Sequence, residues 1–317
     1  MRRDLIVAEK NRMNDLIRRS TLILPVNIAR FVEKAYMRGA DAIVLDLEDA
    51  IPVAEKTRAR RLVRDALPLA ARGGAEVMVR INNASALLDA DLEAAVYPGL
   101  DGLTLPKAES AEQIRSLDAS IERLERERGM APGRVKLSLI VETPRGLLNV
   151  EAIASACARI VTMSVGSEDY CLELGVEPSA DGVELHYPVA RLVTVCKALG
   201  IQATGILGTI AEFRDLAAFE AAAVRARQFG CEGAACIHPE QVAVLNRVFS
   251  PEPAKVEHAR RVIEAFEDGL TRGTASVNFG GKMIDMPVYR RAQVVFARAR
   301  AIADLERRKA DALARFA

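Results

Sequence analysis

The chain has 317 residues, of which 50% are hydrophobic and 27% charged, and its 44 Lys and Arg residues balance its 43 Asp and Glu residues to a net charge of +1. This balance gives no field that attracts nucleic acid or an anionic membrane, and aromatic residues, at 4%, are too scarce for base-stacking platforms. The composition is typical of a globular protein with a sizeable core, and the length fits one large barrel or two ordinary domains.

The sequence also disfavours proteins held together by disulfides or zinc, and secreted or membrane-spanning proteins. The five cysteines are odd in number and lack paired ligand spacing, so they indicate neither a disulfide framework nor a zinc site. The first residues contain no apolar core of a signal peptide, and no apolar run approaches the roughly 18 residues that a membrane helix needs. We therefore expect a cytoplasmic protein.

Short apolar runs alternate with helical patterns from about residue 20 to about residue 250. The runs predict strands at 20–26, 42–47, 76–81, 102–106, 136–142, 160–166, 201–207 and 233–238. Apolar residues at helical spacing predict helices at 28–38, 54–71, 86–96, 110–128, 146–156, 186–199, 213–229 and 239–248. Eight such units predict an α/β fold, the TIM (β/α)8 barrel. A doubly wound open sheet is the alternative, but the turn at Pro25-Val26-Asn27 lacks the glycine fingerprint of that fold.

The pattern changes after residue 250. We expect a helix at 253–272, a Gly-rich loop at 273–286 and a final helix from about 287. The sequence thus predicts a barrel domain at 1–250 and a C-terminal helical extension at 251–317. A barrel does not need this extension to close, so we expect a lid or an oligomerisation arm.

Charged and polar residues gather where the predicted strands end. Glu142 ends the fifth strand and Asp169 follows the sixth, so their carboxylates should converge at one edge of a parallel sheet. Two carboxylates with open positions suit Mg²⁺, and the absence of nearby His disfavours Zn²⁺. The alternative is that each acid caps a helix or pairs with a neighbour such as Arg145.

Arg80 ends the third strand, beside Asn82, and both are candidates for substrate binding, as is Glu142. An Arg that faces a divalent ion suits a substrate carboxylate or an oxygen that gains negative charge. Asp46 and Glu48, two residues apart after the second strand, should point the same way, and one of them is expected to orient Arg80.

Three more residues are candidates for substrate binding. Lys107 binds either an anionic group or the acids at 46–49. His238 lies at the end of the eighth predicted strand. A lone histidine of this kind is more often a structural hydrogen-bonding residue than a catalyst. Lys34 is a cation on a helix surface, where it is solvated unless a phosphate-rich ligand lies across the barrel rim.

Seven motifs, in order, resemble the HpcH/HpaI aldolase and citrate lyase β-subunit family, in its malyl-CoA and citramalyl-CoA lyase-like branch. They are RSTL at 19–22, AIVLDLEDAIP at 42–52, VRIN at 79–82, LPK at 105–107, VETP at 141–144, GSEDY at 166–170 and IHPEQV at 237–242, and GKMIDMP at 281–287 also matches. The resemblance covers nearly the whole chain.

The resemblance implies a TIM barrel in which Glu142 and Asp169 hold Mg²⁺ and Arg80 binds substrate. It also implies a homotrimer, or a dimer of trimers, in which the C-terminal segment covers the site of a neighbouring subunit and delivers Asp285 as an acid or base. The implied reaction is a reversible Claisen-type cleavage of a 3-hydroxyacyl-CoA to an acyl-CoA and a 2-oxo acid.

The chain departs from the family pattern on the side that would bind the acyl carrier. Val26 and Ile28 stand where the family usually has Gly and Arg, and Ala234 replaces a Lys. Strand seven ends without the usual acid. We therefore expect a Mg²⁺-dependent C–C lyase on malyl-, citramalyl- or citryl-CoA-type esters. Alternatives are a thioesterase on the same esters, an aldolase on a free hydroxy-oxo acid, and a non-catalytic barrel that binds CoA esters.

Overall fold

A computed structural model describes residues 16–211, 213–274 and 276–316. The chain divides into two compact units, and each is described by itself. The barrel unit comprises Arg18–Phe249 and Lys309–Ala317, and the second unit comprises Met1–Ile17 and Ser250–Arg308.

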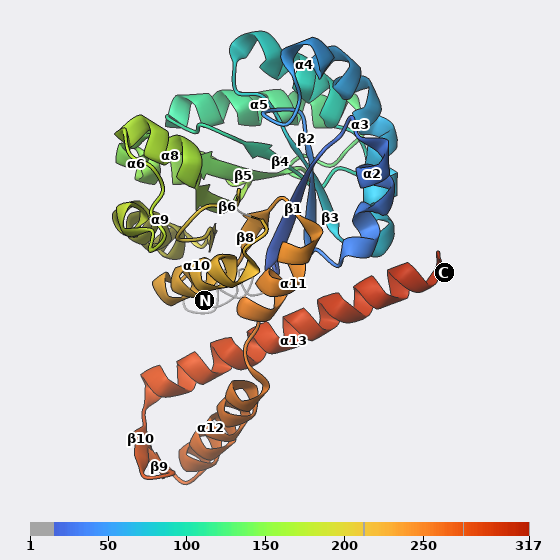
Figure 1. Cartoon of the computed structure of the whole chain (residues 1–317). Coiled ribbons are helices and arrows are strands. Elements are labelled where there is room, and N and C mark those ends of the chain that lie inside the picture. Colours follow the sequence, from blue (N-terminus) through green and yellow to red (C-terminus); the bar gives the residue numbers. More distant parts are fainter. Residues whose placement is uncertain (1–15, 212, 275, 317) are drawn as a thin grey trace. The chain divides into compact units, whose positions relative to one another are not determined.

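Eight parallel strands form the barrel (Figure 1). They are β1 (Ser20–Pro25), β2 (Ala42–Asp46), β3 (Glu76–Arg80), β4 (Gly102–Leu105), β5 (Lys136–Val141), β6 (Ile160–Val165), β7 (Gln202–Thr204) and β8 (Ala234–Cys236). From β1 to β7 each strand pairs with the next, and β8 pairs with β1. Backbone hydrogen bonds from Glu232 to Ala203 and from Gly205 to Gly233, both 2.9 Å, connect the ends of β7 and β8. The TIM-type barrel predicted from the sequence is confirmed.

Helices surround the strands (Figure 1). They are α2 (Ala29–Ala35), α3 (Lys56–Ala70), α4 (Ser85–Ala95), α5 (Ala111–Glu127), α6 (Pro144–Leu148), α7 (Val150–Ala154), α8 (Ser167–Leu174), α9 (His186–Leu199), α10 (Leu216–Phe229) and α11 (Pro239–Val248). Short 3₁₀ turns lie at Tyr36–Arg38, Val53–Glu55, Ala71–Gly73 and Val183–Leu185.

The main core lies between the strands and this layer of helices. All five residues of β2 are buried, as expected for a strand covered on both faces. The inside of the barrel is filled by side chains and leaves a cavity of only about 40 Å³, lined in part by Thr104, Ser138 and Thr162. A packed interior of this kind directs ligand binding to the ends of the strands.

The structure corrects three predicted elements. The sixth unit contains an additional helix, α8, which begins directly after Gly166 and carries Asp169 in its first turn. The helix predicted at 146–156 is two short helices that meet at Asn149. The predicted loop at 273–286 contains a hairpin, because Gly280 and Gly281 adopt φ of 60° and 77°, the conformation of a tight two-residue turn.

The second unit contains α12 (Pro253–Thr271), the hairpin β9 (Val277–Phe279) and β10 (Lys282–Ile284), and α13 (Met286–Ala314) up to Arg308. Its core includes Val262, Phe266 and Ile284. From Lys309 onward, α13 belongs to the barrel unit, where the Lys309 ammonium donates to the Gly39 carbonyl at 2.7 Å. Across both units, no helix within the described ranges is long and apolar enough to cross a membrane.

Candidate active site

Arg80 ends β3 and is held by the acids that follow β2. Its Nε and one terminal nitrogen donate to the two oxygens of Asp46, each at 2.6 Å, in a bidentate pair. Burial opposes the charged form of Arg80, but the hydrogen bonds of Asp46 and the surrounding acids outweigh it and raise the pKa of the guanidinium. Arg80 is therefore a fixed, permanent cation.

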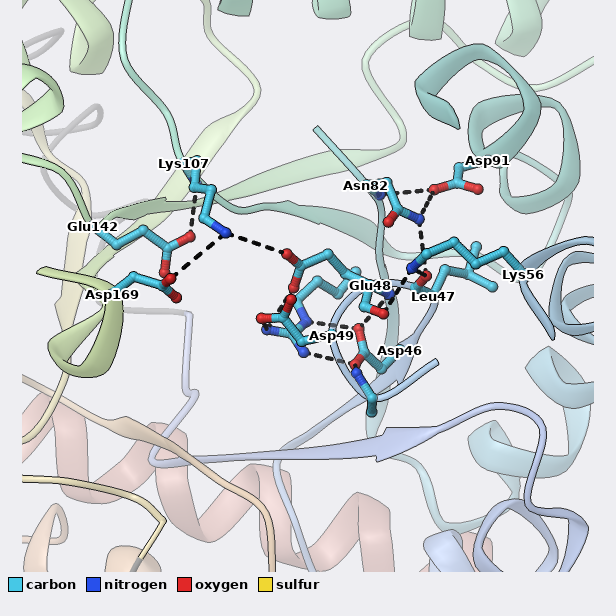
Figure 2. Close-up of polar contacts among 12 residues, drawn as sticks. Asp46, Leu47, Glu48, Asp49, Lys56, Asn82, Asp91, Lys107, Glu142 and Asp169 are labelled. Atoms are coloured by element: carbon cyan, nitrogen blue, oxygen red, sulfur yellow. Dashed lines mark hydrogen bonds and ion pairs between the residues drawn. The ribbon is translucent and has the colours of Figure 1, made fainter. Parts of the chain in front are cut away.

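Asp46 is fully buried and already satisfied. Besides Arg80, it accepts backbone N–H bonds from Glu48 at 2.9 Å and Ala50 at 3.0 Å. A carboxylate that already accepts four hydrogen bonds has no free lone pair for a substrate, so it orients Arg80 and shapes the loop after β2. Figure 2 shows Asp46 in this cluster, beside Glu48 and Asp49.

Glu48 is mostly buried, and its Oε2 forms an ion pair with the second terminal nitrogen of Arg80 at 3.0 Å. Burial raises the pKa of Glu48, the charge of Arg80 lowers it, and the neighbouring Asp49 raises it. Together these effects bring the pKa of Glu48 to about 7. The Lys56 ammonium holds the backbone here, since it donates to the carbonyls of Leu47 and Glu48 at 2.9 and 2.8 Å. Glu48 is thus a rigidly placed carboxyl group that can exchange a proton near neutral pH.

Glu142 follows β5 and is buried, with 6% of its surface exposed. Its Oε1 accepts the backbone N–H of Lys107 at 2.8 Å. Burial, and next the charge of Asp169, raise the pKa of Glu142 to about 7. Gly166 makes room for this side chain, because a Cβ at that position would overlap Glu142 Oε2.

Asp169 lies in the first turn of α8, beside Glu142 (Figure 2). The Lys107 ammonium reaches between two acids, 3.6 Å from Asp169 Oδ1 and 3.9 Å from Glu48 Oε1. Lys107 thereby connects the acids after β5 and β6 to the cluster around Arg80. The structure thus brings Arg80, Asp46, Glu48, Lys107, Glu142 and Asp169 into one connected group of charges.

A cavity of about 370 Å³ opens beside these acids. It is lined by Asn83, Ala84, Lys107, Glu109, Glu142, Thr143, Asp169 and Glu173. Five of these residues were missed as site residues: Ala84 and the polar Asn83, Glu109, Thr143 and Glu173. Asn83 donates to the Lys107 carbonyl at 2.8 Å, and Thr143 donates to Glu109 at 2.8 Å. The adjacency of Asn83 to Asn82, and of Thr143 to Glu142, was the only signal in the sequence.

Other predicted site residues lie elsewhere. The Asn82 amide donates to the Leu47 carbonyl at 2.8 Å and to Asp91 at 2.7 Å, away from the acids of the cavity (Figure 2). His238 caps α11, accepting the Glu240 N–H at 3.3 Å, and stacks on Phe213.

Lys34 is exposed on α2. Asp285 belongs to the second unit, where it accepts the Val288 N–H at 3.1 Å at the start of α13. Val26 and Ala234 are buried in the barrel core.

The residues at the site fit Mg²⁺. Within the described ranges no three His, Cys, Asp or Glu residues form a ligand cluster, and Glu142 and Asp169 are a pair. Magnesium commonly uses one or two carboxylates and fills its other positions with water and substrate oxygens. The mutual repulsion that raises the pKa of Glu142 is also what a divalent cation between the two carboxylates would relieve.

Comparison with known proteins agrees with this site. The family model for HpcH/HpaI aldolase/citrate lyase matches residues 19–239. The citrate lyase subunit beta of Escherichia coli K12 is 34% identical over 300 residues, covering 93% of this chain and 97% of that protein. The (3S)-malyl-CoA thioesterase of Cereibacter sphaeroides KD131 is 33% identical, covering 90% and 95%.

Among solved structures, CitE from Mycobacterium tuberculosis in complex with magnesium, acetoacetate and coenzyme A superposes with a TM-score of 0.69. It shares 28% sequence identity with this chain, and the match covers 90% of this chain and 99% of that one. Members of the family are lyases or thioesterases that act on CoA esters. The chain belongs to the HpcH/HpaI aldolase/citrate lyase family.

Proposed function

We propose that the protein is a Mg²⁺-dependent C–C lyase that cleaves a 3-hydroxyacyl-CoA of the malyl, citramalyl or citryl type into an acyl-CoA and a 2-oxo acid. The observation that carries the proposal is the fixed Arg80 guanidinium, connected through Glu48 and Lys107 to the paired carboxylates Glu142 and Asp169 at the carboxyl ends of the strands. The M. tuberculosis relative, whose complex contains magnesium and coenzyme A, supports the same cofactor and ligand class. We further propose that the enzyme acts in the cytoplasm as a homotrimer or a dimer of trimers.

Cleavage requires a proton to leave the substrate hydroxyl while the electron pair of the C–C bond moves to the thioester enolate. Glu48, with its pKa raised to about 7, is placed to take the hydroxyl proton. Arg80 stabilises the negative charge that moves onto oxygen, an effect typically worth about 3–4 kcal/mol. Asp46 keeps the guanidinium in position throughout.

Two contributions complete the proposal. Mg²⁺ held by Glu142 and Asp169 would polarise the oxo-acid carbonyl and acidify the substrate hydroxyl. Asp285, brought by the second unit of a neighbouring subunit, would return a proton to the enolate carbon. A covered site excludes water, which protects the enolate and strengthens the interactions with Arg80.

A thioesterase is the second candidate, because the C. sphaeroides relative has that activity by name. The same cavity would then direct water to the thioester carbonyl, which breaks the C–S bond and leaves the hydroxy acid intact. The two reactions give different products, and this makes them separable.

The test is product analysis with malyl-, citramalyl- and citryl-CoA, and with a free 4-hydroxy-2-oxo acid, with and without Mg²⁺. We expect 2-oxo acid without free thiol, and only with Mg²⁺. Free thiol without oxo acid identifies a thioesterase, and cleavage of the free acid alone identifies an aldolase. If neither 2-oxo acid nor free thiol forms from any of these compounds, the result contradicts an enzymatic function of this site.

A further inference from the structure

Lys107 has the least ordinary backbone of the described chain. Its φ of 50° makes it the one residue other than glycine, within the described ranges, in the left-handed region, which a side chain with a Cβ adopts at a cost. Both of its backbone polar groups are used, since its N–H donates to Glu142 at 2.8 Å and its carbonyl accepts from Asn83 at 2.8 Å. The strained conformation therefore serves to aim one N–H at a carboxylate of the site.

The Lys107 backbone is itself braced. Gln113, in the first turn of α5, donates to the Asn83 side-chain oxygen at 2.6 Å and accepts the Glu109 N–H at 3.0 Å. Glu142 is thus connected through Lys107 and Asn83 to a helix terminus. This anchoring involves main-chain atoms of Lys107 only, so its side chain can move without releasing Glu142.

The side chain of Lys107 places a positive charge among the acids. Its ammonium lies 3.6 Å from Asp169 and 3.9 Å from Glu48, too far for direct hydrogen bonds, and 41% of the side chain is exposed. A lysine side chain is an ammonium cation, and at these distances it is held by electrostatic attraction rather than by fixed geometry.

We propose that Lys107 is the resident counter-cation of the metal site: its N–H positions Glu142, and its ammonium neutralises the acids until Mg²⁺ displaces it. This inference rests on the proposed function, in which Glu142 and Asp169 hold the metal. Without such a charge, two neighbouring carboxylates would repel one another and distort the empty site. With it, the site stays assembled, and the incoming Mg²⁺ competes with a monovalent cation.

If Lys107 is a counter-cation, loss of its ammonium should strengthen Mg²⁺ binding, whereas structural damage to the site would weaken it. Removing the ammonium in Lys107→Met should tighten Mg²⁺ binding about tenfold, because a nearby positive charge opposes a divalent ion through a partly screened Coulomb repulsion. Lys107→Gly loses the same charge, keeps the N–H to Glu142 and suits the left-handed backbone, so it should also bind Mg²⁺ more tightly. Lys107→Arg keeps the charge and should bind Mg²⁺ like the wild type.

The experiment is calorimetric titration of the full-length protein with Mg²⁺ alone, at low and high ionic strength. The matched control is Lys136→Met, which removes a lysine at the opposite end of β5 from Glu142 and should leave Mg²⁺ affinity unchanged. The gain in Lys107→Met should shrink at high salt.

Equal or weaker binding by both Lys107→Met and Lys107→Gly overturns the inference while leaving the proposed function intact. Absence of Mg²⁺ binding in the wild type and in every Lys107 variant overturns the proposed metal site itself, and the inference with it.

Discussion

At the scale of single residues, the position of Glu142 depends on a neighbour that has no side chain. Gly166 has an ordinary negative φ of −84°, so its importance is steric rather than conformational. A Cβ there would lie 2.9 Å from Glu142 Cβ and 3.0 Å from Ile140 Cγ2, closer than real Cβ atoms approach without a shift. The glycine before α8 therefore allows the carboxylates of Glu142 and Asp169 to meet.

We predict that Gly166→Ala weakens Mg²⁺ binding at least about tenfold, because Glu142 must turn away from Asp169, and lowers the free energy of unfolding by about 1–3 kcal/mol through overpacking. Calorimetry with Mg²⁺ and urea denaturation measure the two effects. Gly175→Ala, at the other end of α8, meets no atom within 4 Å, so it should strain the backbone yet keep Mg²⁺ affinity. Unchanged affinity in Gly166→Ala would contradict the role given to Glu142.

The sequence predicted the grouping of Arg80, Glu142 and Asp169, because parallel strands bring their carboxyl ends together whatever their exact length. It also predicted that Asp46 or Glu48 would orient Arg80, and the structure shows Asp46 in that role. It did not predict Asn83, whose amide contacts Lys107 from the loop after a different strand. Contacts between residues far apart in the chain depend on side-chain geometry that no local pattern encodes.

At the scale of elements, the eight strands were predictable because each is a short apolar run between turn residues. Helix α8 was not, because its eight residues carry three acids and too weak an apolar pattern to stand out beside α9. The hairpin β9–β10 was likewise hidden in a Gly-rich segment whose three-residue strands bury little. Short elements depend on their surroundings more than on their own composition.

The end of α13 offers a separate test of element packing. The Lys309 ammonium donates to Gly39 and, at 3.1 Å, to Asp41, which is also paired with Arg19. We predict that Lys309→Met lowers the free energy of unfolding by about 2 kcal/mol, the typical contribution of hydrogen bonds that involve a charged group, although Gly39 keeps a donor in Asn246 and Asp41 keeps Arg19. Lys255→Met removes only an exposed ion pair with Glu252 and should change stability by less than about 0.5 kcal/mol.

The same cluster makes stability depend on pH. Burial alone would raise the pKa of Asp41, but Arg19 and Lys309 outweigh it and hold that pKa below 3.8. As pH falls, the unfolded chain therefore takes up a proton on Asp41 before the folded chain does. The stabilisation is complete above the pKa of Asp41 in the unfolded chain, and it is lost as pH falls through the pKa of Asp41 in the folded chain. Urea denaturation from about pH 7 to about pH 3 should show a smaller loss in Lys309→Met than in the wild type. An identical loss in both would contradict the contribution of Lys309.

At the scale of the whole molecule, the account requires a residue from the second unit to act in the barrel of a neighbouring subunit. Arg80→Met and Asp285→Asn should each lower the rate about 100-fold or more on their own. Mixed oligomers of the two variants, made by co-expression, should recover up to about a quarter of wild-type activity, since some sites combine an intact Arg80 from one chain with an intact Asp285 from another.

The control for this experiment pairs Arg80→Met with Glu142→Gln. Both residues lie in the barrel unit, so no mixture of these chains assembles an intact site, and no activity should return. Mixtures of Arg80→Met and Asp285→Asn that stay as inactive as this control would show that Asp285 does not act across subunits.

The most direct test of the central claim is the Mg²⁺ dependence of 2-oxo acid release from the best hydroxyacyl-CoA ester, in the wild type and in Glu142→Gln. Glu112→Gln, an exposed carboxylate on α5 paired with Arg115, is the matched control. We expect Mg²⁺-dependent release by the wild type and Glu112→Gln, and a loss of about 100-fold or more in Glu142→Gln. Release that is independent of Mg²⁺, or that survives in Glu142→Gln, would contradict the central claim.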